Sequence, residues 1–143
     1  HMVEAYRRAE KGKPTVLYGE MRTLRDNSED GITILSPEFL EERMIAHPSC
    51  FINKTAYEQL GTYDTNYCSV ADYDLMLRYK ESKAVAFIPV YKLITNFRTG
   101  GMSSTSKAYL DLLELQKNHG LISKKQYRTA KWKAILAEKV HRK

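Results

Sequence analysis

Segments typical of β-strands alternate with segments typical of helices between residues 15 and 97, and this alternation constrains the fold more than any other feature. The run Thr15–Leu24 has the β-branched and apolar content of a strand, and Gly19 within it predicts a bulge or a close backbone approach. A polar loop after this run ends in Asp30-Gly31, a turn signal that predicts a hairpin onto residues 32–35. The pattern predicts an α/β fold with a small mixed sheet and flanking helices.

Helix and strand signals continue through the middle of the chain. Ser36 precedes Pro37, and residues 39–44 have an apolar stripe at helical spacing, which predicts a capped helix in this region. The other segments expected before residue 98 are a strand over 49–53, a helix over 54–60 that Gly61 ends, a helix over 72–82, and two strand segments within 84–97 that Pro89 separates. Helices over 3–11, 106–119 and 123–141 complete the expected elements.

Composition limits the kind of protein this chain can be. Its 143 residues, with 43% hydrophobic and 28% charged content, suffice for one domain with a core. His1-Met2 looks like a cloning remnant, so the native sequence is expected to begin near Val3, inside a helix, as a piece of a longer protein. No apolar run approaches the roughly 20 residues that span a bilayer, and no charged-then-apolar leader opens the chain. We therefore expect a cytoplasmic location, with Cys50 and Cys68 as reduced thiols rather than zinc ligands.

The last part of the chain, residues 105–143, is expected to form a basic helical tail. From Lys117 onward the sequence has nine basic residues and one acid, Glu138. The apolar residues of the last helix fall on one face that lysines flank: Trp132, Ile135, Leu136 and Val140. Two interpretations stay open for residues 123–143. The helix either docks on its own domain with a solvated basic face, or it binds peripherally to an anionic membrane, which would be the inner face of the cell membrane.

Two carboxylates, Asp72 and Asp74, open the helix over 72–82 just after a turn-rich segment. Two residues on a helix correspond to about 200° of rotation, so the two side chains cannot face the same pocket. Asp74 lies four residues before Arg78, the spacing of a helix-surface ion pair, which favours a structural role. Asp72, at the helix start, is either an N-cap or a general base that takes a proton from an attacking hydroxyl.

Five motifs occur in the order found in family 2 glycosyltransferases of the GT-A type. They are Tyr18-Gly19-Glu20, Ile45-Ala46-His47-Pro48-Ser49, Gly61-Thr62-Tyr63-Asp64, Ala71-Asp72-Tyr73-Asp74-Leu75 and Phe97-Arg98-Thr99-Gly100-Gly101-Met102-Ser103. On these motifs, residues 3–104 resemble the acceptor-side part of this family. The resemblance implies a partial GT-A fold followed by the helical tail. Glu20 replaces the family's usual Asp, and Ala71 replaces the acid that commonly precedes the catalytic base.

The resemblance implies an inverting enzyme that transfers a sugar from a nucleotide-sugar donor to a glycan or lipid-linked acceptor. Asp72 matches the family's catalytic base. The implied substrate-binding residues are His47, Asp74, Arg98, Gly100 and Gly101, with His47 beside the donor diphosphate or the acceptor. Arg98 and free backbone N–H groups of the Gly-Gly loop would offset phosphate charge on the leaving group. Taken alone, His47 also suits a packed histidine and the glycines a flexible turn.

The donor-binding half of such an enzyme is missing from this sequence. No Asp-x-Asp motif after a nucleotide-binding βαβ pattern precedes Tyr18, and Asp72-Tyr73-Asp74 occurs at the wrong place in the order. The resemblance therefore implies that the nucleotide and a divalent metal, Mg²⁺ or Mn²⁺, bind to an N-terminal half of the full-length protein. We expect no metal ligand in this chain and no activity from this piece alone.

The rival interpretation is a basic module that binds nucleic acid or protein without catalysis. A nucleic-acid surface would need basic residues interleaved with aromatic ones, or a recognition helix, whereas the last helix offers one Trp and one Tyr. This composition disfavours nucleic acid as the partner. Affinity for DNA or RNA that falls steeply with added salt would favour the nucleic-acid interpretation.

Overall fold

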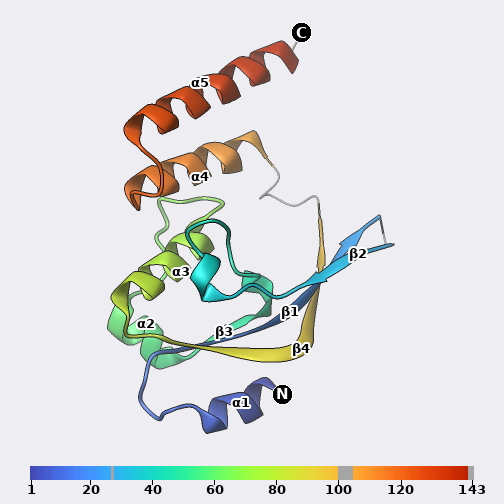
Figure 1. Cartoon of the computed structure of the whole chain (residues 1–143), viewed down its shortest axis with the longest axis vertical. Coiled ribbons are helices and arrows are strands. Elements are labelled where there is room, and N and C mark those ends of the chain that lie inside the picture. The colour runs from blue at the N-terminus through green and yellow to red at the C-terminus, as the bar shows by residue number, and fades with distance from the viewer. Residues whose placement is uncertain (27, 100–104, 142–143) are drawn as a thin grey trace. The chain divides into compact units, whose positions relative to one another are not determined.

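The computed structural model describes residues 1–26, 28–99 and 105–141, with side chains described through residue 137 (Figure 1). The chain forms two compact units, which are unit 1 (residues 1–63 and 72–99) and unit 2 (residues 64–71 and the chain from residue 100 onward). The elements are α1 Met2–Arg8, β1 Thr15–Arg25, β2 Ser28–Thr33, β3 Cys50–Ile52, α2 Lys54–Leu60, α3 Ala71–Ser82, β4 Ala86–Arg98, α4 Ser106–Asn118 and α5 Lys124–His141.

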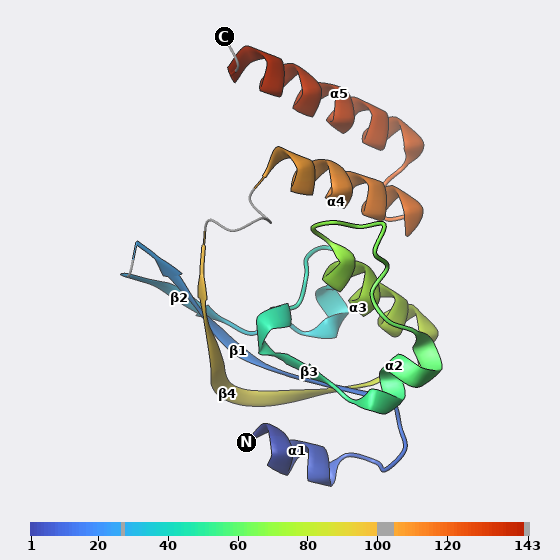
Figure 2. The same ribbon diagram turned by 180° about the vertical axis from the view of Figure 1, so that it is seen from behind.

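Strand β1 is the centre of a four-stranded mixed sheet in unit 1. It pairs in parallel with β4 along nearly its whole length, from Thr15↔Ala86 to Leu24↔Arg98. Its other edge is shared by two antiparallel partners, β3 near its start and β2 near its end. Helix α1 covers one face of this sheet, and α2 and α3 lie on the other (Figures 1 and 2). The expected α/β fold with a small mixed sheet and flanking helices is confirmed at this level.

Gly19 lies where β4 crosses closest to β1. A Cβ atom at this position would clash with Cγ1 of Ile94 and would lie 3.1 Å from the carbonyl oxygen of Lys92. The pairing register shifts on both sides of Glu20, so β4 bulges against β1 at this point. Both features expected from the glycine, a bulge and a close backbone approach, are therefore present.

The hairpin after β1 forms, but its turn lies elsewhere than the sequence predicts. The chain reverses between Arg25 and Ser28, and Asp26 has a φ of 49°. Asp30-Gly31 lies inside β2 instead, at a register shift in which Gly31 pairs with Thr23 and adopts a φ of 147°. The Asp-Gly signal thus serves a bulge rather than a turn, because both features need the backbone freedom of glycine.

Two further predictions are corrected by tertiary contacts. The helix expected over 37–44 is only a 3-10 turn, Pro37–Phe39, with the backbone N–H of Glu38 donating to Ser36 Oγ at 3.5 Å. The carbonyl of Leu40 accepts a hydrogen bond from the Tyr73 hydroxyl at 2.5 Å, which occupies an oxygen that a continuing helix would use. The two strands expected on either side of Pro89 are one strand, β4. Pro89 is tolerated there because its missing N–H falls on a strand edge that no described strand pairs with.

The core of unit 1 lies on both faces of the sheet. On one face Met2 of α1 packs with Leu17 and Val90. Helix α3 supplies four large buried side chains to the other part of the core: Leu75, Met76, Leu77 and Tyr79, each at most 1% exposed. Asn53 joins the start of α2 to the start of β1, since its Oδ1 accepts the backbone N–H groups of Ala56 and Thr15 at 3.0 Å each. The partly exposed amide therefore holds α2 at the end of the sheet where β1 begins.

Unit 2 contains the paired helices α4 and α5 (Figures 1 and 2). Thr105 caps α4, and its Oγ1 accepts the backbone N–H of Ala108 at 3.2 Å. Gly120, with a φ of 71°, ends α4 as its sequence position predicts. None of the helices in the described part of the chain has the length and apolar character that crossing a membrane requires.

Candidate functional site

Asp72 lies in the first turn of α3, with its side chain partly exposed. The helix begins one residue earlier, at Ala71, so Asp72 is not its N-cap. Its Oδ1 nevertheless accepts the backbone N–H of Tyr73 at 2.8 Å, which satisfies one of the free donors of the first helical turn. Asp72 therefore has a structural role, and its second carboxylate oxygen can still accept a proton or a hydrogen bond.

His47 begins the 3-10 turn His47–Ser49, which leads into β3. Its Nε2 is hydrogen-bonded to the hydroxyl of Tyr63 at 3.0 Å, and the two rings meet edge to face with centroids 5.9 Å apart. Its Nδ1 is buried and has no hydrogen-bond partner among the described residues. Burial lowers the pKa of His47 below its ordinary value, and the negative charge of Asp72 partly opposes that shift. The imidazole is therefore neutral at neutral pH.

Tyr63 connects His47 with a second tyrosine from α2. The hydroxyls of Tyr57 and Tyr63 lie 3.4 Å apart, and the ring centroids are separated by 6.2 Å. Burial raises the pKa of Tyr63, and the neighbouring Tyr57 and the charge of Asp72 add to that increase. Tyr63 thus stays protonated and can donate a hydrogen bond across the whole physiological pH range.

Cys50 is the third group that senses the charge of Asp72. Burial raises the pKa of its thiol to about 12, with a further contribution from Asp72. The thiol donates to the carbonyl oxygen of Ala46 at 3.5 Å. Cys50 is therefore an unreactive neutral side chain rather than a nucleophile. The charge of Asp72 therefore acts electrostatically on His47, Tyr63 and Cys50, although the four residues come from different segments.

Asp74 lies apart from this cluster, as the helical spacing predicts. Its side chain is only 7% exposed, and Oδ2 accepts from Arg78 Nε at 2.7 Å. Arg78 also donates to the backbone oxygen of Thr62 at 2.6 Å and to that of Leu60 at 3.4 Å. The expected Asp74–Arg78 ion pair is confirmed. It holds the segment around Gly61 against α3, and that segment carries Tyr63.

The remaining predicted site residues lie at or beyond the end of β4. Arg98 is the last residue of this strand and is exposed. Gly100 and Gly101 lie outside the described residues. Of the predicted group, Asp72 and His47 are therefore coupled electrostatically, and Asp74 is in a separate ion pair.

The side chains around Asp72 do not fit a metal site. Within residues 1–26, 28–99 and 105–137, no three His, Cys, Asp or Glu side chains gather closely enough to bind an ion. Magnesium and manganese prefer several carboxylate or carbonyl oxygens. The cluster offers one carboxylate, a neutral imidazole, the protonated phenol of Tyr63 and a protonated thiol. No chemical step at this site is therefore assigned to a metal.

Tyr57, Tyr63 and Cys50 are site residues that the motif analysis leaves without a role. Tyr63 belongs to the Gly61–Asp64 motif, so its position two residues after a helix-ending glycine is a usable signal. Nothing in the local sequence connects Tyr57 or Cys50 to Asp72.

No protein-family model, curated protein or solved structure matches this chain significantly. Function must therefore be inferred from the side chains themselves. A partly exposed carboxylate that acts electrostatically on a neutral imidazole and a protonated phenol can accept a proton from a bound hydroxyl group. The Tyr63 phenol, which His47 holds through a hydrogen bond, can orient that hydroxyl.

Proposed function

We propose that this chain is the acceptor-side part of an inverting glycosyltransferase in which Asp72 is the general base. The observation that carries the proposal is the position of Asp72, partly exposed in the first turn of α3, where its charge acts on His47 and Tyr63. The five glycosyltransferase-like motifs of the sequence support it independently. Two of these motifs supply His47 and Asp72 themselves, and a third supplies Tyr63.

The reaction needs a base at this position for a simple reason. A sugar hydroxyl attacks the anomeric carbon of the donor, so a new carbon–oxygen bond forms while the bond to the departing nucleoside diphosphate breaks. Asp72 takes the proton that the hydroxyl loses, which prevents positive charge from building on the attacking oxygen. Attack from the face opposite the leaving group inverts the anomeric configuration.

His47 and Tyr63 act in the proposal by orientation rather than by proton transfer. Both are neutral, because burial lowers the pKa of the imidazole and raises that of the phenol. Nε2 of His47 is hydrogen-bonded to the hydroxyl of Tyr63, and Nδ1 is buried, so neither imidazole nitrogen is open to take the acceptor's proton. A second hydroxyl of the acceptor sugar can then hydrogen-bond to the hydroxyl of Tyr63.

The donor, and the divalent cation expected with it, are assigned to another part of the full-length protein. This assignment rests on the absence of an Asp-x-Asp motif before Tyr18 in the sequence. Arg98 and the glycines at 100 and 101 keep their proposed role near the leaving diphosphate. The proposed acceptor is a glycan, free or lipid-linked.

The decisive experiment changes Asp72 to Asn in the full-length protein. The amide oxygen can still accept the Tyr73 N–H, so the helix start is preserved. With a panel of nucleotide sugars, release of nucleoside diphosphate should fall by about 10²-fold to 10⁴-fold in kcat, the usual contribution of a general base. The unfolding midpoint should stay close to that of the unchanged protein.

Glu58→Gln is the matched control, because it makes the same carboxylate-to-amide change in an exposed pair with Lys54 on α2. It should leave turnover unchanged. Full turnover by Asp72→Asn, or an equal loss in Glu58→Gln, would remove Asp72 from the mechanism.

A further inference from the structure

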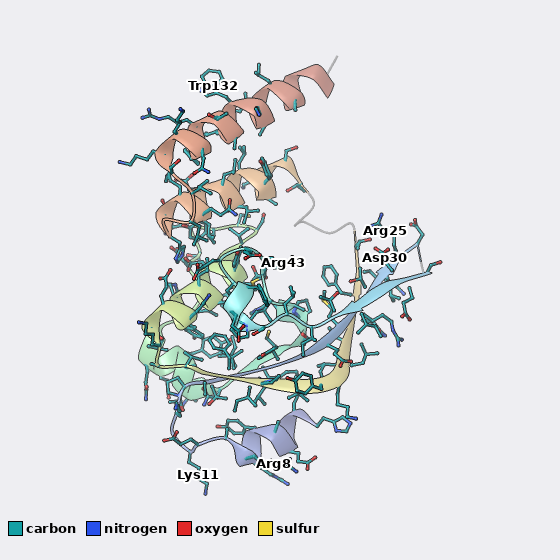
Figure 3. The ribbon with its side chains drawn as sticks, in the orientation of Figure 1. Arg8, Lys11, Arg25, Asp30, Arg43 and Trp132 are labelled. Carbon is teal, nitrogen blue, oxygen red and sulfur yellow. The ribbon has the colours of Figure 1, made fainter. Side chains whose placement is uncertain are left out.

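Helix α5 presents two large apolar side chains to solvent. Trp132 is 66% exposed and Leu136 is 57% exposed, although both could contribute to a core. They are four residues apart, so they lie on the same face of the helix. Figure 3 shows Trp132 on the side of α5 that faces away from α4. Exposed apolar groups of this size on one face indicate a binding surface.

The opposite side of α5 packs against α4, and this fixes the rotation of the helix. The ring of Tyr127 lies under Lys117 of α4, with Nζ 4.6 Å from the ring centroid. Lys131 Nζ donates to the Tyr127 hydroxyl at 3.0 Å. Tyr127 and Trp132 are five residues apart, which is about 140° around the helix axis. Trp132 therefore cannot turn toward α4 without breaking the Tyr127 contacts.

Positive charge surrounds the exposed apolar pair. Residues 124–137 contain five cations and no acid: Lys124, Lys125, Arg128, Lys131 and Lys133. Arg128 lies four residues and Lys125 seven residues before Trp132, so both share its face. Both side chains are exposed. The outer face of α5 is defined here by Lys125, Arg128, Trp132 and Leu136.

We infer that the outer face of α5 binds the surface of an anionic lipid bilayer. The helix would lie parallel to the surface, with Trp132 and Leu136 entering the headgroup layer and Lys125 and Arg128 pairing with lipid phosphates. This combination of a Trp, a Leu and flanking cations is what an interfacial helix needs. The inference goes beyond the proposed activity and does not depend on it, because none of these residues belongs to the Asp72 cluster.

A nucleic acid fits this face less well than a bilayer does. Phosphate backbones would engage the cations, and Trp132 could stack on a base. Leu136 would then stay exposed to water, since neither phosphate nor ribose offers an apolar partner. A bilayer uses all four side chains of the face. Charge complementarity and the apolar pair together therefore select the lipid surface.

The chain provides its own probe, because Trp132 is its single tryptophan. Vesicles of phosphatidylcholine and phosphatidylglycerol in equal parts should shift its fluorescence to the blue, and brominated lipids should quench it. Vesicles of phosphatidylcholine alone should produce a much smaller shift. Added salt should weaken binding to the anionic vesicles, because the attraction of exposed cations is screened.

Two double variants distinguish binding by this face from attraction that arises from the overall positive charge of the chain. Lys125→Gln with Arg128→Gln should lower partitioning onto anionic vesicles by roughly tenfold or more, since each cation near the surface contributes to binding. Lys11→Gln with Lys107→Gln removes the same charge from exposed positions elsewhere and should change partitioning little. Leu136→Gln should reduce the blue shift without altering helix content by circular dichroism.

Three results would overturn the inference. The first is no blue shift with anionic vesicles while the helix content is intact. The second is an equal loss in both double variants. The third is binding to a single-stranded RNA oligonucleotide that the α5 pair abolishes, with no vesicle binding under the same conditions.

Discussion

His47 makes the stability of the protein depend on pH in mildly acidic solution. Burial lowers its pKa below the ordinary value of 6.5, so the folded chain binds fewer protons here than the unfolded chain as the pH falls. The contribution of His47 to the free energy of unfolding is therefore largest above pH 6.5 and is lost progressively as the pH falls toward the lowered pKa. The coupling to Asp72 reduces this effect but does not reverse its sign.

Urea unfolding at several pH values above and below 6.5 measures this dependence. His47→Gln should show a smaller decrease in the free energy of unfolding over that range than the unchanged protein. His1→Gln, an exposed imidazole at the chain start, should keep the full decrease. Identical pH profiles for all three proteins would mean that His47 has an ordinary pKa in the folded state.

The Arg78–Asp74 pair joins α3 to the segment that carries Tyr63. Asp74 is nearly buried, so loss of Arg78 removes a cation from a carboxylate that water scarcely reaches. Arg78→Met should therefore destabilise the protein by roughly 3 kcal/mol, at the lower end of the range for breaking a buried pair because Arg78 is partly exposed. Asp74→Asn combined with Arg78→Met should cost less than the sum of the two single changes, because both single changes disrupt the same interaction.

Urea unfolding of the four proteins completes this double-mutant cycle. Lys54→Met offers a comparison on the exposed pair with Glu58 and should cost less than about 1 kcal/mol. Additive losses for Arg78 and Asp74 would show that the two side chains do not interact appreciably in solution.

Local sequence signals correctly predict the helices whose ends are determined by the residues at those ends. Helix α2 ends at Gly61 and α4 ends before Gly120, and the two glycines have positive φ values of 85° and 71°. The helix expected after Ser36 is shortened to a 3-10 turn in a segment whose carbonyls accept hydrogen bonds from α3, Leu40 from Tyr73 and Glu38 from Lys80. No local pattern contains those contacts. The same applies to Pro89, which is tolerated within one strand because no described strand pairs with the other edge of β4.

The candidate site likewise contains residues that local sequence signals indicate and residues that they do not. Asp72 and His47 are predicted because each lies in a recognisable motif, and helical spacing correctly separates Asp74 from Asp72. Tyr57 and Cys50 are not predicted, because they join the cluster only through the packing of α2 and the start of β3 beside α3. Their positions depend on tertiary structure rather than on spacing along the chain.

Because the chain forms two compact units, we expect a substitution that destabilises one unit to leave the other folded. Thr105 caps α4, and its hydroxyl accepts the backbone N–H of Ala108. Thr105→Ala should remove about 1 kcal/mol from the stability of α4. Hydrogen exchange should then accelerate in α4 and α5, while the amides of β1 and β4 keep their protection.

Thr105→Ser serves as the control, since it keeps the hydroxyl and should preserve exchange rates in both units. Faster exchange across the sheet in Thr105→Ala would indicate that the two units unfold as one cooperative structure. Exchange measured by mass spectrometry on peptides resolves the two possibilities.

The protonated thiol of Cys50 gives the chain an unequal pair of labelling sites. Maleimide dyes react with thiolates, so exposed Cys68 should be modified quickly while Cys50, with its pKa of about 12, is modified only when its surroundings open. The rate of the slow second labelling step then measures how often the surroundings of Cys50, whose pKa Asp72 influences, open to solvent. This measurement needs no engineered cysteine.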